Sequence, residues 1–370
     1  MQTILSIFGT RPEAIKMAPV VGELQKYPDE IRSLVCVTAQ HRQMLDQVLA
    51  LFKITPDYDL NLMKPNQSLA QITAAIITGL DPVLQSVAPD WILVQGDTTT
   101  VMAAALVGFY HRVKIGHVEA GLRTGDKSQP FPEEANRCLT DVLSDLYFAP
   151  TEPARQNLLK EGVPVERILV TGNTSIDALK QVAALPYHWA DGPLAGIDPD
   201  GRIILVTAHR RENFGEPFLN LCQAIRDLAL QHPDVHFVYP EHLNPNVQQP
   251  VHAILEGIAN VHLIAPLDYL PMVHLMAKST LVLTDSGGIQ EEAPSLGKPV
   301  LVMRDTTERP EAVTAGVARL VGTNRDRIVE NVNRLLQDET AYRRMAQAAN
   351  PFGDGTAARK IVKRLLAWNL

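Results

Sequence analysis

Residues 283 to 292 read Leu283-Thr284-Asp285-Ser286-Gly287-Gly288-Ile289-Gln290-Glu291-Glu292. An apolar run that ends in a hydroxyl and two glycines predicts a buried strand leading into the start of a helix. The first N–H groups of a helix lack intrahelical partners and the dipole is positive there, so a phosphate can bind. The glycines leave room for a diphosphate, and a carboxylate one turn later can accept hydrogen bonds from ribose. The stretch therefore favours a nucleotide-sugar site, although a simple cap and turn has the same pattern.

The size and composition of the chain indicate a globular protein of two domains. Its 370 residues exceed the size at which one hydrophobic core keeps growing. No apolar run is long enough to span a bilayer, and the first residues run into a strand without a basic leader. The formal charge of −7 disfavours nucleic acid as a partner. We therefore expect a cytoplasmic protein with no membrane partner and no nucleic-acid partner.

Cysteines and histidines give no sign of a metal site. Cys36, Cys138 and Cys222 are odd in number, far apart and set in apolar periodic segments, which argues for reduced thiols. The histidines are scattered, without the spacing to carboxylates that metal sites use. We therefore expect no bound metal.

Short apolar runs alternate with helical patterns along the chain. Strands are expected at 4–8, 34–38, 91–95, 114–118, 146–149 and 168–171, then at 203–207, 235–239, 261–264, 281–284, 299–302 and 318–321. Helices are expected near 13–26, 41–51, 68–88, 98–110, 133–143 and 152–161. Strands that are apolar throughout indicate parallel sheets covered on both faces. Residues 185–193 and 198–201 break the rhythm, so we predict an α/β protein with domains over 1–180 and 200–350 and a ligand cleft shared between them.

Polar residues follow several strands of the first half. Arg11, after the first strand, and Lys16, one turn into the next helix, can face one anion, or Arg11 can form a surface pair with a glutamate. Asp97, Glu119 and Glu133 follow successive strand or loop positions. Carboxylates brought close together shift each other's pKa, which favours proton transfer near neutrality.

Each of these acids also has a structural interpretation. Asp97 is well placed to cap the helix that follows it. Glu119 and Glu133 can form ion pairs with Arg123 and Arg137. As a set facing an anion site, the three acids favour catalysis.

In the second half, His209 stands beside two arginines at the end of a strand, where a phosphate contact or an acid fits better than a core role. Glu241 and His242 follow the next strand, and Arg309 follows a further one.

Long motifs occur in a fixed order along essentially the whole chain. They are Gly9-Thr10-Arg11-Pro12-Glu13-Ala14-Ile15-Lys16, Gly96-Asp97-Thr98-Thr99-Thr100, His117-Val118-Glu119-Ala120-Gly121-Leu122-Arg123-Thr124, Pro132-Glu133-Glu134, His209-Arg210-Arg211-Glu212, Asp285-Ser286-Gly287-Gly288 with Glu291-Glu292, and Arg304-Asp305-Thr306-Thr307-Glu308-Arg309-Pro310. In these motifs the chain resembles the non-hydrolysing bacterial UDP-N-acetylglucosamine 2-epimerases. The resemblance implies a GT-B fold of two Rossmann-like domains with the active site in the interdomain cleft. It further implies that the last helix, 354–370, returns to the first domain, and that the protein is a homodimer using no metal or cofactor.

The resemblance also implies roles for individual residues. The catalytic positions are Asp97, Glu119, Glu133 and His209. The positions on the UDP moiety are Arg11, Lys16, Arg210, Ser286, Gly287, Gly288, Glu292 and Arg309. A second site, or the sugar side of the first, would use Gln40, His41, Gln43 and His242. The implied reaction is C2 epimerisation of UDP-N-acetylglucosamine for cell-surface polysaccharide synthesis; a hydrolysing epimerase, a GT-B glycosyltransferase and a catalytically impaired UDP-sugar binding protein are the alternatives.

The chain departs from the family pattern at three positions. Gln95 stands where a histidine is common, and Asn66 stands where some members have an arginine of an activator site. Glu241 stands where a small apolar residue is common. A carboxylate there could repel a diphosphate, or it could point away or pair with an arginine.

Overall fold

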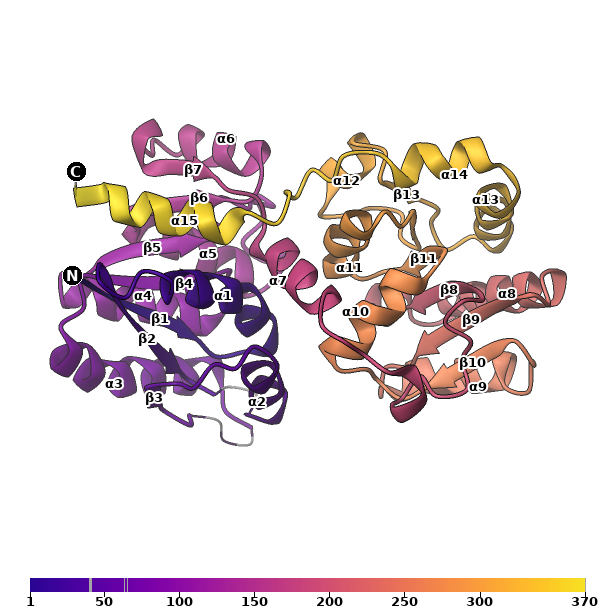
Figure 1. Cartoon of the computed structure of the whole chain (residues 1–370), viewed down its shortest axis with the longest axis horizontal. Coiled ribbons are helices and arrows are strands. Elements are labelled where there is room, and N and C mark those ends of the chain that lie inside the picture. The colour runs from indigo at the N-terminus through magenta and orange to yellow at the C-terminus, as the bar shows by residue number, and fades with distance from the viewer. Residues whose placement is uncertain (40–41, 63, 65, 370) are drawn as a thin grey trace. The chain divides into compact units, whose positions relative to one another are not determined.

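The computed structural model describes the chain except residues 40, 41, 63, 65 and 370, and it describes only the backbone at Gln43 and Asn369 (Figure 1). The described chain forms two compact units. Unit 1 comprises Met1–Ala178 and Phe352–Leu370, and unit 2 comprises Leu179–Pro351.

Unit 1 is built on a parallel sheet in the order β3-β2-β1-β4-β5-β6-β7. Its strands are β1 (Gln2–Phe8), β2 (Ile31–Val37), β3 (Tyr58–Asp59), β4 (Trp91–Gln95), β5 (Lys114–Val118), β6 (Leu146–Ala149) and β7 (Ile168–Val170). Its helices are α1 (Arg11–Leu24), α2 (Arg42–Leu51), α3 (Leu69–Val87), α4 (Thr99–Tyr110), α5 (Glu133–Leu143), α6 (Glu152–Lys160) and α15 (Ala357–Leu366), with 3-10 turns η1 (Val165–Arg167) and η5 (Ala367–Asn369). Helix α7 (Thr174–Ala183) runs from unit 1 into unit 2.

Unit 2 is built on a parallel sheet in the order β10-β9-β8-β11-β12-β13. Its strands are β8 (Arg202–Thr207), β9 (Val235–Pro240), β10 (Val261–Ile264), β11 (Leu281–Thr284), β12 (Val300–Val302) and β13 (Ala318–Leu320). Its helices are α8 (Glu216–Gln231), α9 (Pro245–Leu255), α10 (Tyr269–Lys278), α11 (Gly287–Glu292), α12 (Pro310–Thr314), α13 (Arg325–Gln337) and α14 (Glu339–Ala346), with turns η2 (Trp189–Asp191), η3 (Arg211–Asn213) and η4 (Ala293–Leu296).

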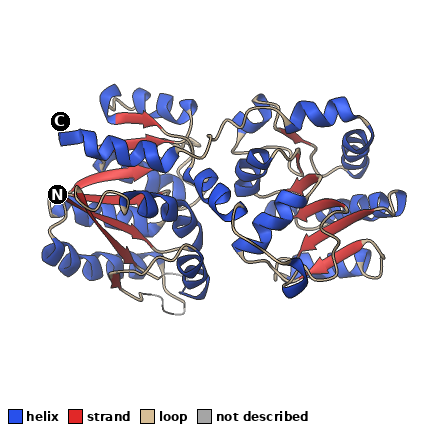
Figure 2. Cartoon of the chain, in the orientation of Figure 1, coloured by secondary structure: helices blue, strands red, loops and turns tan. Residues whose placement is uncertain are grey.

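Helices lie around the strands in each unit (Figure 2). The central strands β4 and β11 are buried along their whole length, which is why their sequences lack polar alternation. The prediction of an α/β protein with two Rossmann-like parallel sheets is confirmed. Strand β3 was not predicted, because two residues carry no periodic signal.

The last helix, α15, packs against α1 within unit 1. The buried carboxylate of Asp177 accepts the first backbone N–H groups of α15, from Ala357 at 3.2 Å and Ala358 at 3.0 Å. Burial raises the pKa of Asp177, and the two N–H groups oppose that shift. The C-terminal segment is therefore fixed to unit 1 by a cap as well as by apolar packing.

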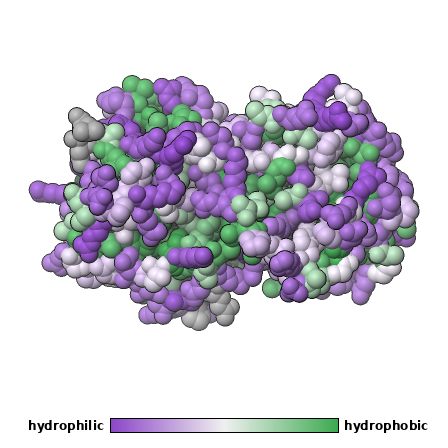
Figure 3. All heavy atoms as spheres, viewed as in Figure 1, coloured by the Kyte–Doolittle hydropathy of each residue, from purple (hydrophilic) through white to green (hydrophobic). Residues whose placement is uncertain are grey.

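No helix among the described residues is long and apolar enough to cross a membrane. Hydrophilic side chains dominate the face shown in Figure 3, with hydrophobic ones in smaller groups.

Candidate active site

The strand order reverses at one point in each sheet. In unit 1 this point lies between the neighbouring strands β1 and β4, and in unit 2 it lies between β8 and β11. Sheets of this type bind ligands beyond the carboxyl ends of the strands at such a reversal. The loops that follow these four strands carry Arg11, Asp97, His209 and Ser286. Topology thus supports the choice of these loops as sites.

Glu13 organises the loop after β1. Its Oε2 accepts the N–H groups of Gly9 at 3.1 Å and Thr10 at 2.7 Å, and its Oε1 accepts the hydroxyl of Thr98 at 2.7 Å. Burial raises the pKa of Glu13, and these hydrogen bonds partly oppose the shift. The carboxylate therefore connects the loop of Arg11 with the loop of Asp97. From the sequence, the only role considered for it was a surface pair with Arg11, although the Thr10-to-Glu13 spacing is that of a capping box.

Glu119 is paired with the predicted UDP-binding lysine. Lys16 Nζ lies 2.5 Å from Glu119 Oε2, and Asn173 Nδ2 donates to the same oxygen at 3.1 Å. The backbone of Glu119 has φ of 69°, a left-handed conformation that is uncommon for a residue with a side chain. Backbone strain of this kind gathers at functional sites. The structure thus brings Lys16 and Glu119 together.

The expected ion pair between Glu119 and Arg123 is not formed. Arg123 instead binds Asp141 and Glu161, both at 2.7 Å. Asp141 also lies 2.6 Å from Nδ1 of His117, whose Nε2 contacts the carbonyl oxygen of Gly96 at 2.8 Å. Burial alone would raise the pKa of Asp141, but His117 and Arg123 overcome it and lower the pKa. This buried network supports the loop that carries Asp97, and sequence reasoning gave neither His117 nor Asp141 a role.

The expectation that Asp97 caps a helix is wrong. Thr98 is the N-cap of α4, and its side chain accepts the N–H of Val101 at 3.4 Å. The Asp97 carboxylate instead forms an ion pair with Arg137 on α5. Since a threonine next to it takes the cap, the Asp97 side chain is available for another role.

Glu133 is the first residue of α5 and is half-buried. The predicted pair with Arg137 is wrong, because Arg137 binds Asp97 and, at 3.0 Å, Glu134. Within the described part of the chain, Glu133 has no hydrogen-bond or ion-pair partner. No hydrogen bond or ion pair within the described part of the chain therefore gives this carboxylate a structural role.

Asp285 plays in unit 2 the part that Glu13 plays in unit 1. It is fully buried, and its Oδ2 accepts the backbone N–H groups of His209 and Arg210, both at 2.8 Å. The imidazole of His209 stacks on that of His242, with centroids 5.4 Å apart and planes at 14°. Burial lowers the pKa of His209, Asp285 opposes this shift, and His242 and Arg210 add to it. Loops after β8, β9 and β11 thus meet at His209.

Gly287 lies beside two guanidinium groups. A β-carbon added there would be 3.6 Å from Nη2 of Arg210 and 3.8 Å from Nη2 of Arg309. At Gly288 an added β-carbon would meet no atom within 4 Å. Helix α11 has only six residues, so its dipole is small and the two arginines supply most of the positive charge. Arg210, Gly287 and Arg309 therefore form one anion-binding arrangement.

Acidic residues hold these arginines in place. Arg309 forms an ion pair with Glu291, and Arg210 Nη1 lies 3.8 Å from Glu308. The side-chain hydrogen bonds of Arg304 lower the pKa of Glu308 to about 2, so Glu308 stays ionised. The neighbouring Glu292 accepts the hydroxyl of Tyr269 at 3.1 Å.

The remaining predicted residues are less informative. Gln40 and His41 lie outside the described residues, and only the backbone of Gln43 is described, in α2. Arg11 lines a cavity of about 330 Å³ with Thr10, Pro12, Met44 and Thr98. Ser286 precedes α11, and its N–H donates to Thr284 Oγ1 at 2.9 Å.

Glu241 contacts a histidine. Its buried Oε2 lies 3.1 Å from Nε2 of His252, on α9. The alternative that it pairs with an arginine is therefore wrong. Among the described residues this Oε2 makes no hydrogen bond, so the carboxylate that was expected to repel a diphosphate contacts His252 by proximity alone.

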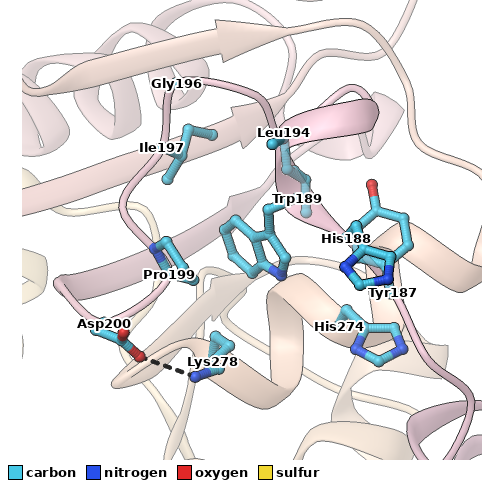
Figure 4. Close-up of a pocket in the computed structure, with 11 residues that line it drawn as sticks. Tyr187, His188, Trp189, Leu194, Gly196, Ile197, Pro199, Asp200, His274 and Lys278 are labelled. Carbon is cyan, nitrogen blue, oxygen red and sulfur yellow. Dashed lines mark hydrogen bonds and ion pairs between the residues drawn. The ribbon is translucent and has the colours of Figure 1, made fainter.

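A separate cavity of about 520 Å³ lies elsewhere in unit 2 (Figure 4). Tyr187, Trp189, His274 and Lys278 are among its lining residues, and Tyr187 stacks on His274 with centroids 5.1 Å apart. None of the predicted site residues lines it.

No group of three or more potential metal ligands occurs among the residues that the structure describes. All three cysteines are free thiols, with Cys36 and Cys222 buried and Cys138 half-buried.

Two Rossmann-like sheets define a GT-B protein of the nucleotide-sugar type. One unit carries carboxylates in ion pairs with basic side chains, and the other carries a glycine flanked by two arginines at its strand reversal. A kitacinnamycin glycotransferase shares the fold at 14% identity and a TM-score of 0.64, with 98% of this chain and 99% of that chain covered. The family model described as UDP-N-acetylglucosamine 2-epimerase matches residues 23–366, and the chain belongs to this family.

Individual relatives agree with this family. A UDP-N-acetylglucosamine 2-epimerase of Yersinia pestis is 60% identical, with 98% of each chain covered. The one from Escherichia coli K12 is 59% identical with the same coverage. A crystal structure of the Neisseria meningitidis UDP-GlcNAc 2-epimerase bound to UDP-GlcNAc has 54% identity and a TM-score of 0.88, covering 98% of this chain and 99% of that chain.

Proposed function

We propose that this protein interconverts UDP-N-acetylglucosamine and UDP-N-acetylmannosamine without hydrolysing them. The observation that carries the proposal is Gly287 between the guanidinium groups of Arg210 and Arg309, because this arrangement suits a diphosphate. Family membership and the polar loops of unit 1 support the same substrate.

The reaction must overcome a weakly acidic C2–H bond. Breaking the C1–O bond first gives an oxocarbenium-like centre, which acidifies the C2 proton. Loss of that proton yields 2-acetamidoglucal and UDP, and UDP then adds back while a proton returns to the other face. Arginines stabilise the departing diphosphate, and carboxylates stabilise positive charge and carry the proton.

We assign the proton transfers and charge stabilisation to Asp97, Glu119 and Glu133. Ion pairs with Arg137 and Lys16 orient the carboxylates of Asp97 and Glu119. Glu133, which has no partner among the described side chains, suits a role in which protonation changes during turnover. Ser286, Gly288 and Glu292 complete the UDP site of unit 2, with Glu292 on the ribose, and Arg11 and Lys16 remain assigned to the UDP moiety. His242, Gln40, His41 and Gln43 remain assigned to the sugar side or to a second site.

Proton NMR of UDP-N-acetylglucosamine in deuterated water tests the proposal. We expect deuterium at C2 of both epimers, including after treatment of the protein with a chelator. Normal UDP binding with neither exchange nor epimer would leave a binding protein and overturn the enzymatic proposal. Release of free N-acetylmannosamine, or of UDP to an acceptor, would indicate a hydrolysing epimerase or a glycosyltransferase.

We also propose that the enzyme is a cytoplasmic homodimer that supplies cell-surface polysaccharide synthesis. The contacting helices α4 and α5 expose large apolar side chains, with Phe109 57%, Tyr110 64%, Leu139 52% and Val142 80% exposed. Exposed apolar side chains on two contacting helices suit association with a second copy. Val142→Glu should shift the mass measured by light scattering toward that of one chain, and an unchanged dimer would exclude this surface.

A further inference from the structure

The two carboxylate oxygens of Asp285 have different surroundings. Oδ2 receives the N–H groups of His209 and Arg210, and the side-chain amide of Asn213 at 3.4 Å. Oδ1 is buried and has no hydrogen-bond partner among the residues that the structure describes. Nδ1 of His209 lies 3.6 Å from Oδ1. This separation exceeds a hydrogen bond, but a small rotation of either side chain would close it.

We infer that Asp285 is a positioning residue for His209: Oδ1 accepts Nδ1–H of the imidazole, so that Nε2 serves the departing diphosphate. The inference rests on the proposed function and deepens it. A buried carboxylate oxygen without a donor is costly, and a neutral imidazole has one N–H to give. The tautomer with its proton on Nδ1 removes that cost.

The groups around His209 act in opposite directions. Asp285, after β11, stabilises the imidazolium. His242, after β9, and Arg210, in the same loop, disfavour it, as burial does. Because the negative diphosphate adds to the effect of Asp285, His209 takes a proton on Nε2 more readily when the ligand is bound.

The protons balance in this scheme. As the C1–O bond breaks, its electron pair goes to the β-phosphate oxygen, and Nε2–H of the imidazolium donates a hydrogen bond to that oxygen. The C2 proton goes to a carboxylate of unit 1. Re-addition of UDP reverses the bond change at C1, and a carboxylate returns a proton to C2. Asp285 neither gives up nor takes a proton in this scheme and touches no reacting atom.

The test compares two variants of the loop anchor. Asp285→Asn keeps an oxygen that can accept the two backbone N–H groups but removes the charge. Asn213→Ala, the control, removes one donor to Asp285 and leaves the charge in place. Nitrogen NMR of ring-labelled histidines reports tautomer and titration, with His209→Gln used to assign the His209 signals.

We expect wild-type His209 to carry its neutral-form proton on Nδ1. In Asp285→Asn we expect its titration midpoint to move to lower pH and turnover to fall by about 10–100-fold, the scale seen when a partner orienting a histidine is lost. Asn213→Ala should leave the midpoint in place. A wild-type ring protonated on Nε2, or an unchanged midpoint in a folded Asp285→Asn protein, would overturn the inference.

The titration needs no substrate, so it separates the two proposals. A shifted midpoint in a protein that never epimerises its substrate would uphold the pairing of Asp285 with His209 and reject the proposed function. Turnover with an unshifted midpoint would uphold the function and reject the pairing.

Discussion

At the point where its strand order reverses, unit 1 presents Arg11 and Asp97, whereas unit 2 presents His209, Arg210 and Ser286. The same arrangement of strands thus supports a carboxylate beside one arginine in unit 1, and a histidine, an arginine and a hydroxyl in unit 2. Each loop is held from behind by a buried acid, Glu13 in unit 1 and Asp285 in unit 2. The strand order determines where the functional loop lies, and a buried carboxylate fixes the conformation of that loop. The side chains that the loop carries determine whether the site is acidic or basic.

The largest expected effect tests the acidic half of this comparison. Asp97→Asn, Glu119→Gln and Glu133→Gln should each lower turnover by about 10²–10⁴-fold, because amides cannot carry the charge or exchange protons. UDP affinity, measured by calorimetry, should change little, because each amide keeps the size and much of the hydrogen bonding of the acid that it replaces. Near wild-type turnover in any variant would reduce that residue to a structural partner.

The substitution Gly287→Val tests the cationic half of the comparison, because it adds a larger side chain beside the arginines. A valine side chain would enter the space between Arg210 and Arg309. Overpacking costs of about 1–3 kcal/mol correspond to UDP binding roughly 5–150-fold weaker. The melting temperature without UDP should stay close to wild type, because an added β-carbon meets only ordinary contacts. Gly287→Ala, the smaller control, should lose less affinity; equal affinity for all three proteins would remove this glycine from the site.

The acid behind the arginines predicts a dependence of stability on pH. Arg304 lowers the pKa of Glu308 from 4.5 to about 2. A lowered pKa contributes stability above pH 4.5 that is lost as the pH falls toward 2. Glu308→Gln should therefore be less stable than wild type at pH 7, by at most about 1–2 kcal/mol because the carboxylate is partly exposed. In urea unfolding, the difference in the free energy of unfolding between wild type and Glu308→Gln should narrow below pH 4.5. A difference that stays constant with pH would show that the charge of Glu308 is not its cause.

The smallest effect is expected at Glu241. Repulsion of a diphosphate would make Glu241→Val faster, with an advantage that shrinks as salt rises. Since the carboxylate is buried against His252, we expect instead a turnover unchanged within about twofold and a loss of stability of about 0.5–1 kcal/mol, as for a weak ion pair. His252→Ala should give a similar loss. A faster, salt-sensitive Glu241→Val would restore the repulsion hypothesis.

Sequence patterns predicted the strands well because the central ones are apolar throughout, as β4 and β11 show. They predicted which loops are polar, because the polar residues come directly after those strands. They did not predict the partners of these residues. Lys16 and Glu119 are 103 positions apart, and Arg137 binds Asp97 rather than Glu133 because of how α5 packs. Local spacing could have identified Glu13 through its capping box, but only the fold brings Asp285 to His209.

The cap that Asp177 gives to α15 bears on how the chain folds during synthesis. Residues 179–351 must leave the ribosome before α15 can reach its place on unit 1. Until then the surface of α1 that α15 covers is open, and the Asp177 carboxylate lacks the two N–H groups that it binds in the finished protein. Unit 1 is therefore the first unit to be synthesised, but its structure can be completed only after unit 2 has been translated. Without α15, unit 1 has to stay soluble through the translation of the whole second unit.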